Sequence, residues 1–174
     1  MARKRVSSFA PISGRDAKIL ILGSMPGRES LRRRQYYAFK HNTFWRIITE
    51  LLRLDAGATY RERIRALKSS RIALWDVLES CAREGSLDTM IEGEVANGFE
   101  KFFRNHPSVT HVFFNGAKAE SSFKRHVAGR LEERAISYAR LPSTSPAHAS
   151  LSFERKLRAW RVILASGRVH RRRT

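Results

Sequence analysis

The chain has 174 residues, and its 34 Lys and Arg against 16 Asp and Glu give a formal net charge of +18 at pH 7. Its hydrophobic fraction of 42% supports one packed domain and is spread over too few residues for two. The single Cys81, expected to be a small buried hydrophobe, excludes an internal disulfide framework. No apolar run is long enough for a membrane span or a secretion signal. These properties favour a protein that is not secreted and that has a polyanionic partner.

Short apolar runs alternate along the chain with stretches of helical spacing. The apolar runs predict strands at residues 19–22, 71–78, 111–114 and 136–141. The helical spacing predicts helices at residues 43–54, 60–67, 90–103, 117–127 and 151–165, with Trp45, Trp75 and Trp160 at core-facing positions. Strands separated by helices indicate an α/β fold with a mostly parallel sheet covered on both faces. One domain is expected over residues 9–166, and the basic ends, 1–8 and 167–174, are expected to be flexible tails.

Three of the four predicted strands lead into residues that suit ligand binding. The first is followed by Gly-Ser-Met-Pro-Gly (23–27), the third ends in Asn115, and the fourth leads into Pro-Ser-Thr-Ser-Pro-Ala-His (142–148). In open α/β sheets, ligands bind at the carboxyl ends of the strands. Each segment alone has an ordinary explanation as a turn or a helix cap. Together they suit a phosphate-rich ligand that carries a flat ring, such as a base drawn out of a nucleic acid.

Five motifs together resemble one known family. They are GSMPG (23–27), SL (30–31), QYY (35–37), N-x-FW (42–45) and LPSTSPA (141–147). This set is similar to the uracil-DNA glycosylase superfamily, above all to its hypoxanthine-DNA glycosylase branch, also called DNA-deoxyinosine glycosylases. The resemblance spans residues 18–150 and implies a three-layer α/β/α sandwich with a four-stranded parallel sheet. It also implies hydrolysis of an N-glycosidic bond in DNA that contains deaminated bases, hypoxanthine above all, without metal or cofactor.

The resemblance also implies roles for particular residues. Asn42, which precedes x-Phe-Trp, matches the catalytic amide by which this branch positions water. Met25 stands where the mismatch-specific relatives have their water-binding Asn, so that route is absent. Base contacts are expected from Gly23, Ser24, Met25, Tyr37 and Asn115, with the ring of Tyr37 stacked on the base. DNA contacts are expected from Arg32, Arg33, Arg34, Ser143, Thr144, Ser145 and His148. The branch usually has His-Pro where Phe39-Lys40 stands and often has Asn at position 148, and these departures bear on base preference more than on reaction class.

The reaction requires little beyond what these residues supply. Loss of the base leaves an oxocarbenium-like sugar, so a water held in line by a carboxamide oxygen suffices, while hydrogen-bond donors stabilise the leaving base. The base must leave the duplex stack to be reached. Asn42 could instead cap the following helix, and one side-chain oxygen is hardly expected to serve both purposes. Tyr37 could instead be a packed ring beside Tyr36. The enzyme is expected to be monofunctional, because Lys40, the only lysine in the first motif, is not in an evident apolar pocket.

Other functions are also compatible with the sequence. One alternative is a uracil-specific or G:U/T mismatch-specific glycosylase, and another is a nucleic-acid binding module without catalysis. A metal-dependent nucleotide or phosphate-ester hydrolase would need paired acids, whereas the motif loops offer only Glu29, with Asp76 at the end of the second strand. The expected protein is a cytoplasmic, DNA-associated monomer.

Overall fold

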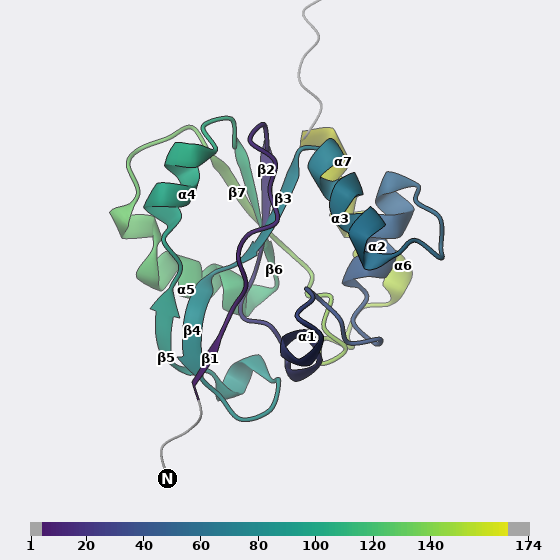
Figure 1. Ribbon diagram of the computed structural model, residues 1–174, viewed down its shortest axis with the longest axis horizontal. Coiled ribbons are helices and arrows are strands. Elements are labelled where there is room, and N and C mark those ends of the chain that lie inside the picture. Colours follow the sequence, from purple (N-terminus) through teal and green to yellow (C-terminus); the bar gives the residue numbers. More distant parts are fainter. Residues whose placement is uncertain (1–4, 167–174) are drawn as a thin grey trace, which may run out of the picture.

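A four-stranded parallel sheet forms the centre of the computed structural model, which describes residues 5–166 (Figure 1). Its strands are β2 (Ile19–Gly23), β3 (Ile72–Asp76), β6 (His111–Asn115) and β7 (Ser137–Leu141), in the order β3-β2-β6-β7. In β2 and β3 every residue is buried, the pattern of a parallel sheet covered on both faces. The predicted α/β fold with a four-stranded parallel sheet is therefore confirmed.

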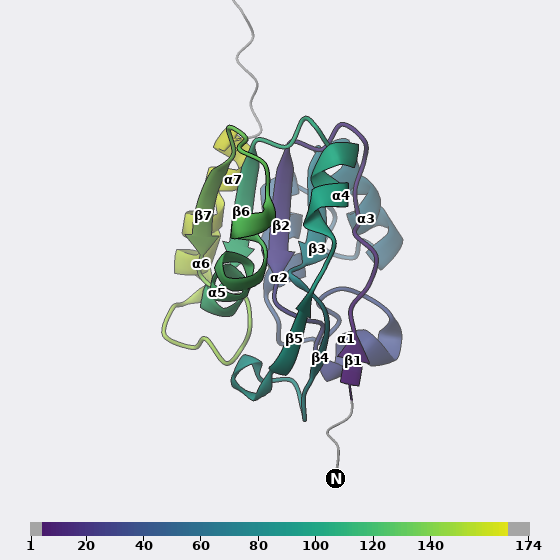
Figure 2. The ribbon, with the colours of Figure 1, turned by 90° about the vertical axis from the view of Figure 1, so that its left-hand side faces the viewer.

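Helices lie on both sides of this sheet, which gives three layers (Figures 1 and 2). One side carries α4 (Phe99–Asn105) and α5 (Ala117–His126). The other side carries α2 (Phe44–Leu52), α3 (Tyr60–Ser69), α6 (Phe153–Trp160) and α7 (Val162–Ser166). A further short helix, α1 (Arg28–Arg33), follows the first motif, and the 3₁₀ turns η1 (Asp88–Met90) and η2 (Ala128–Arg130) complete the helical elements of the described chain.

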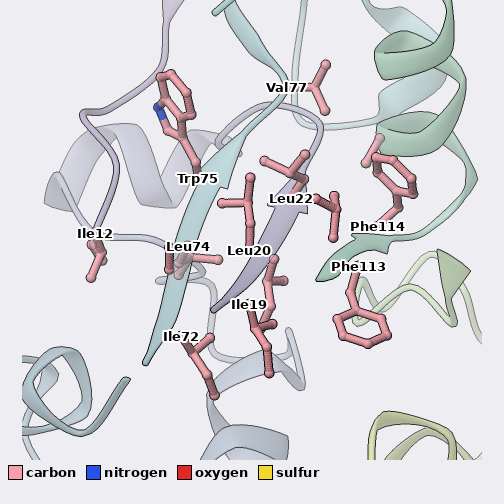
Figure 3. Packing of buried hydrophobic residues seen from close by; sticks show 14 of the residues in the cluster. Ile12, Ile19, Leu20, Leu22, Ile72, Leu74, Trp75, Val77, Phe113 and Phe114 are labelled. Atoms are coloured by element: carbon pink, nitrogen blue, oxygen red, sulfur yellow. The ribbon is translucent and has the colours of Figure 1, made fainter. Parts of the chain in front are cut away.

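The core is built from side chains of the central strands (Figure 3) and of the helices that face them. The predicted core positions Trp45, Trp75 and Trp160 are no more than 7% exposed, and Cys81 is fully buried. Trp160 also donates from its Nε1 to the carbonyl of Pro142 at 2.9 Å. Helix α6 is therefore attached to the loop that follows β7.

The helix predicted over residues 90–103 is wrong in its first half. There the chain forms β5 (Glu92–Ala96), which pairs antiparallel with β4 (Leu78–Ala82). Gly93 has φ +57°, in the left-handed region that interrupts a helix. Gly98 precedes α4, and a glycine inside a helix costs about 1 kcal/mol. Residues 92–96 are therefore more stable as a strand paired with β4 than as part of a long helix.

The N-terminal residues also differ from expectation. Residues 5–7, assigned above to a flexible tail, form β1 (Arg5–Ser7), which pairs antiparallel with β4. Arg5 Nη2 donates to Ser80 Oγ at 2.7 Å. The rest of both predicted tails, residues 1–4 and 167–174, lies outside the described residues. Within residues 5–166, no helix has the length and apolar character needed to cross a bilayer.

Candidate active site

A cavity of about 740 Å³ opens at the carboxyl ends of the central strands. It is bordered by the turn at residues 23–27, by Tyr37 and Asn42, by residues 86–89, and by the loop at residues 143–148. All three strand-end segments of the sequence analysis therefore meet at one place, as expected for this class of sheet. The volume lies within the ordinary range for small-molecule sites.

The turn after β2 approaches its neighbours too closely for any residue but glycine at its first position. A Cβ on Gly23 would lie 2.6 Å from both Asp76 Oδ1 and the Tyr37 hydroxyl. The Ser24 hydroxyl donates to Asp88 Oδ1 at 2.6 Å. Met25 is 7% exposed, and within the described chain no acceptor takes its backbone N–H. The turn thus leaves an unpaired backbone N–H at a residue that borders the cavity.

Tyr37 is held in an unusual conformation. Its φ of +51° lies in the left-handed region, which is rare for an aromatic residue and is typical of strained functional positions. Its ring stacks on Phe44 with centroids 4.1 Å apart, and its hydroxyl accepts from Asn115. Burial raises the pKa of Tyr37, so its hydroxyl stays protonated. The neighbouring Tyr36 is buried and donates from its hydroxyl to the carbonyl of Ala10 instead.

Asn115, expected to contact the base, has its amide committed within the protein. Its Nδ2 donates to the Tyr37 hydroxyl at 3.0 Å and to Thr144 Oγ1 at 2.9 Å. Its Oδ1 accepts the backbone N–H of Thr144 at 2.9 Å. Because both amide hydrogens are used, Asn115 positions Tyr37 and the 143–148 loop in this structure.

Thr144 was expected to contact DNA, and its burial contradicts that expectation. The residue is 0% exposed, and its carbonyl accepts the backbone N–H of Thr43 at 3.0 Å. It therefore joins the loop to Asn115 and to the start of α2. Like Ser143, Ser145 and His148 it borders the cavity, but its hydroxyl accepts from Asn115.

Asn42 also borders the cavity, at the start of α2. Its Oδ1 accepts the backbone N–H of Phe44 at 3.0 Å. This is the helix-capping alternative raised by the sequence, although the backbone N-cap residue is Thr43, without a capping bond of its own. A carboxamide oxygen has two lone pairs, so one remains for a further hydrogen bond.

A buried lysine that the sequence did not indicate holds the 143–148 loop. Lys156 of α6 is 4% exposed, and its Nζ donates to the carbonyl of His148 at 2.8 Å and to that of Ser145 at 3.5 Å. Burial lowers the pKa of Lys156. In the sequence this lysine is indistinguishable from the other cations of an amphipathic helix, so no local signal could have identified it.

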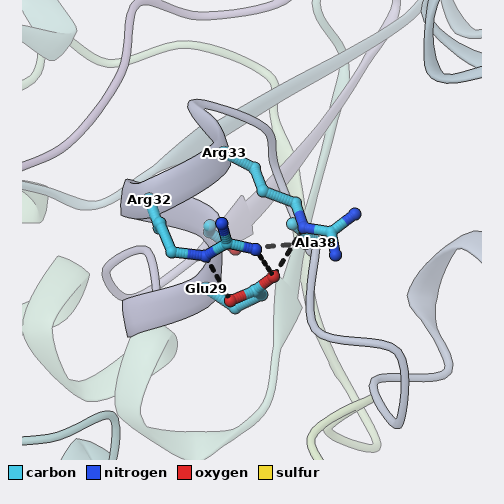
Figure 4. A network of polar contacts seen from close by, with 5 residues as sticks. Glu29, Arg32, Arg33 and Ala38 are labelled. Atoms are coloured by element: carbon cyan, nitrogen blue, oxygen red, sulfur yellow. Dashed lines mark hydrogen bonds and ion pairs between the residues drawn. The ribbon is translucent and has the colours of Figure 1, made fainter.

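The arginine run lies on and just after the exposed helix α1 (Figure 4). Arg32 forms two bonds with the Glu29 carboxylate, and Arg33 forms a third at 2.5 Å. These bonds hold the pKa of Glu29 down at about 2. Arg32 and Arg33 keep 66% and 54% of their side chains exposed, and Arg34 is exposed as well. One carboxylate thus orders two of the three cations without covering them.

Asp76 is a buried acidic group of this site. It ends β3 opposite Gly23, lines the cavity, and is 3% exposed. Its Oδ2 is buried without a hydrogen-bond partner. Burial, helped by the negative charge of Asp88 and opposed by Arg83, raises the pKa of Asp76 to about 7. No group of three or more potential metal-ligating side chains occurs among residues 5–166.

Comparison with known proteins identifies the family to which the chain is similar. Residues 11–164 match the family model of the uracil DNA glycosylase superfamily. The hypoxanthine DNA glycosylase of Methanosarcina barkeri is 40% identical over 112 residues, 64% of this chain and 71% of that protein. The protein of the same name from Methanosarcina acetivorans is 34% identical over 149 residues, 85% of this chain and 91% of that protein.

Structural comparison agrees with these relatives. A solution NMR structure from Methanosarcina acetivorans, described as a candidate uracil DNA glycosylase, has a TM-score of 0.77 and 31% identity to this chain. The match covers 92% of this chain and 99% of that one. The chain belongs to the uracil-DNA glycosylase superfamily. Within it, the chain is a DNA glycosylase of the hypoxanthine-DNA glycosylase branch, a hydrolase of N-glycosyl bonds.

Proposed function

We propose that the protein removes hypoxanthine from DNA by drawing the deaminated nucleotide into the cavity and hydrolysing its glycosidic bond. The observation that carries this proposal is the convergence of the Tyr37 ring, the 23–27 turn and Asn42 around one cavity of about 740 Å³. The names of the two curated relatives support hypoxanthine as the substrate.

Tyr37 suits the recognition of a flat base. Phe44 supports one face of its ring, and a base stacked on the opposite face would lie beside the 23–27 turn. The backbone N–H of Met25 can then donate to the base as negative charge develops on it, which is the kind of preorganised donor that accelerates such reactions. A flipped base is held between aromatic contact and polar groups in this way in base-excising enzymes.

Asn42 is proposed to hold the attacking water. Its Oδ1 keeps one lone pair after accepting from Phe44. Since the sugar becomes a strong electrophile as the base departs, orientation of the water contributes more than its deprotonation. The capping bond fixes the rotamer of Asn42, so the two roles support each other rather than compete.

Phosphate contacts are proposed for the exposed Arg32, Arg33 and Arg34 and for the rim residues Ser143, Ser145 and His148. Such contacts position the duplex and carry most of the salt-dependent affinity. A net charge of +18 favours the same partner. Action as a monomer in the cytoplasm remains a prediction.

The first prediction concerns the substrate. Duplexes carrying one hypoxanthine, uracil or xanthine should be incubated with excess enzyme and treated with alkali to cut at abasic sites. We expect cleavage to be fastest for hypoxanthine, with matched undamaged duplex as the control. Absence of abasic product from every deaminated duplex would contradict the proposal, and faster release of uracil would reassign the substrate.

The second prediction concerns the product. We expect an abasic site in an uncut strand, because a lyase needs an amine nucleophile that can form a Schiff base. Lys40 of the first motif is exposed and does not border the cavity. Lys118, which borders it, is paired with Glu94. The buried Lys156 donates to the carbonyls of Ser145 and His148. Borohydride added during the reaction should therefore trap no protein–DNA adduct. A trapped adduct that disappears in Lys40→Met or Lys118→Met would show a lyase instead.

A further inference from the structure

Asp76 has a position that packing does not explain. The residues before it in β3, Ile72 to Trp75, are apolar and buried, and an apolar residue at position 76 would continue that pattern. A buried carboxyl oxygen without a partner costs stability, yet Oδ2 of Asp76 is such an atom. Buried titratable groups of this kind in a cavity are characteristic of functional sites.

The Asp76 carboxyl also borders the cavity proposed to receive the extracted base. Asp76 Oδ1 and the Tyr37 hydroxyl both lie 2.6 Å from the Cβ position that Gly23 leaves empty. The carboxyl is therefore beside the ring proposed to stack on the base and beside the turn that borders the cavity. Gly23 creates the space in which these two groups meet.

The groups facing Asp76 favour its neutral form. Asp88 from η1 opposes ionisation and Arg83, which follows β4, favours it. Tyr36 and Tyr37 bring protonated hydroxyls, since burial raises the pKa of each. Burial dominates the balance and raises the pKa of Asp76 to about 7. Near neutral pH a large share of the protein thus carries a carboxylic acid here, which can donate a hydrogen bond.

Two other side-chain donors at the cavity are already engaged. The Ser24 hydroxyl donates to Asp88, and both amide hydrogens of Asn115 go to Tyr37 and Thr144. The Oδ2 atom of Asp76 has no hydrogen-bond partner among residues 5–166. A base entering the cavity would therefore meet an uncommitted donor in this carboxyl.

We propose that Asp76 is a further catalytic residue, whose neutral carboxyl donates a hydrogen bond to a carbonyl oxygen or ring nitrogen of the extracted base. The base gathers negative charge as its bond to the sugar breaks, so this bond strengthens toward the transition state. A carboxylic acid kept neutral by an apolar site serves as such a donor in other enzymes. The inference rests on the proposed base excision and adds a named group to it.

Single-turnover excision of hypoxanthine between pH 5.5 and 8 tests the proposal. With a donor that titrates at about pH 7, the wild-type rate should be about tenfold lower at pH 8 than at pH 6. Asp76→Asn keeps an N–H donor and cannot ionise, so its rate should not fall with pH. Asp76→Ala should be slower by about 10²–10³-fold at pH 6 and equally independent of pH.

Tyr37→Phe is the matched control, because it removes the hydroxyl that lies beside the carboxyl and keeps the carboxyl itself. It should retain the wild-type pH dependence, and melting curves should show that all variants fold. Wild-type rates and pH dependence in both Asp76 variants would overturn the proposal. A wild-type rate that rises with pH, and loses that rise in Asp76→Asn, would also overturn it, because the carboxylate would then be the active form.

Binding of free hypoxanthine, followed by NMR titration at pH 6 and pH 8, separates this inference from the proposed function. We expect wild type to bind more weakly at pH 8 and Asp76→Asn to bind equally at both. If wild type released no base from DNA but showed this pattern, the proposed excision would fail and the contact with the base would stand. Equal binding by wild type at both pH values, or no binding up to millimolar base, would refute the contact.

Discussion

Replacing Asn42 by alanine is expected to slow single-turnover excision by about 10²–10³-fold, the usual cost of losing one preorganised polar group. The same change removes the acceptor for the Phe44 N–H and should lower stability by about 1 kcal/mol, as loss of a helix cap does. Affinity for DNA should change little, because phosphate contacts supply most of it. Excision rate, melting temperature and DNA affinity of the same preparation measure the three effects.

Thr59→Ala is the matched control for the capping effect. Thr59 caps α3 by accepting the Glu62 N–H, and it does not border the cavity. Its loss should cost a similar amount of stability and leave the excision rate unchanged. An Asn42→Ala protein with a lowered melting temperature and a wild-type rate would restrict Asn42 to the capping role and remove it from the chemistry.

Replacing Asp76 by asparagine is expected to stabilise the protein at alkaline pH relative to wild type. The pKa of this carboxyl rises from 3.8 to about 7 on folding, so the folded state binds more protons between these values. Wild-type stability should therefore fall as pH rises through that range. At about 1.4 kcal/mol per pH unit, the ionised carboxyl costs about 4 kcal/mol above pH 7.

Denaturant unfolding of both proteins at pH 4.5 and pH 8 measures this effect. The difference in unfolding free energy between Asp76→Asn and wild type should grow in favour of the variant by an amount on the order of 3–4 kcal/mol between the two conditions. Groups that titrate identically in both proteins cancel in this difference. The same difference at both pH values would show that Asp76 is not held neutral by burial. If the difference in unfolding free energy grows as expected, the site retains a carboxyl that destabilises the folded protein at pH 8, as functional sites do.

The local pattern of apolar residues was sufficient to predict the strands of the central sheet and several of the helices that cover it. Apolar runs placed β2, β3, β6 and β7, and helical spacing placed α2, α3 and α5, because burial on the sheet or on one helix face repeats with a short period. The second sheet, with strand order β1-β4-β5, was missed because β1 pairs with β4 across a long sequence separation and the pairing of β4 with β5 is irregular in register. Nothing in the local composition of residues 5–7 or 92–96 indicates a partner.

The sequence by itself determined which residue types stand at the carboxyl ends of the strands. These residues were sufficient to predict a ligand site there and the family of the protein. Only the tertiary structure decided which of their polar atoms are free. Thr144 and Asn115 resemble ligand contacts in the sequence but bond to each other, whereas Asp76 keeps a buried oxygen without a partner. The reason is physical: a side chain's type is local, but its hydrogen bonds and its burial depend on residues that are distant in the chain and close only after folding.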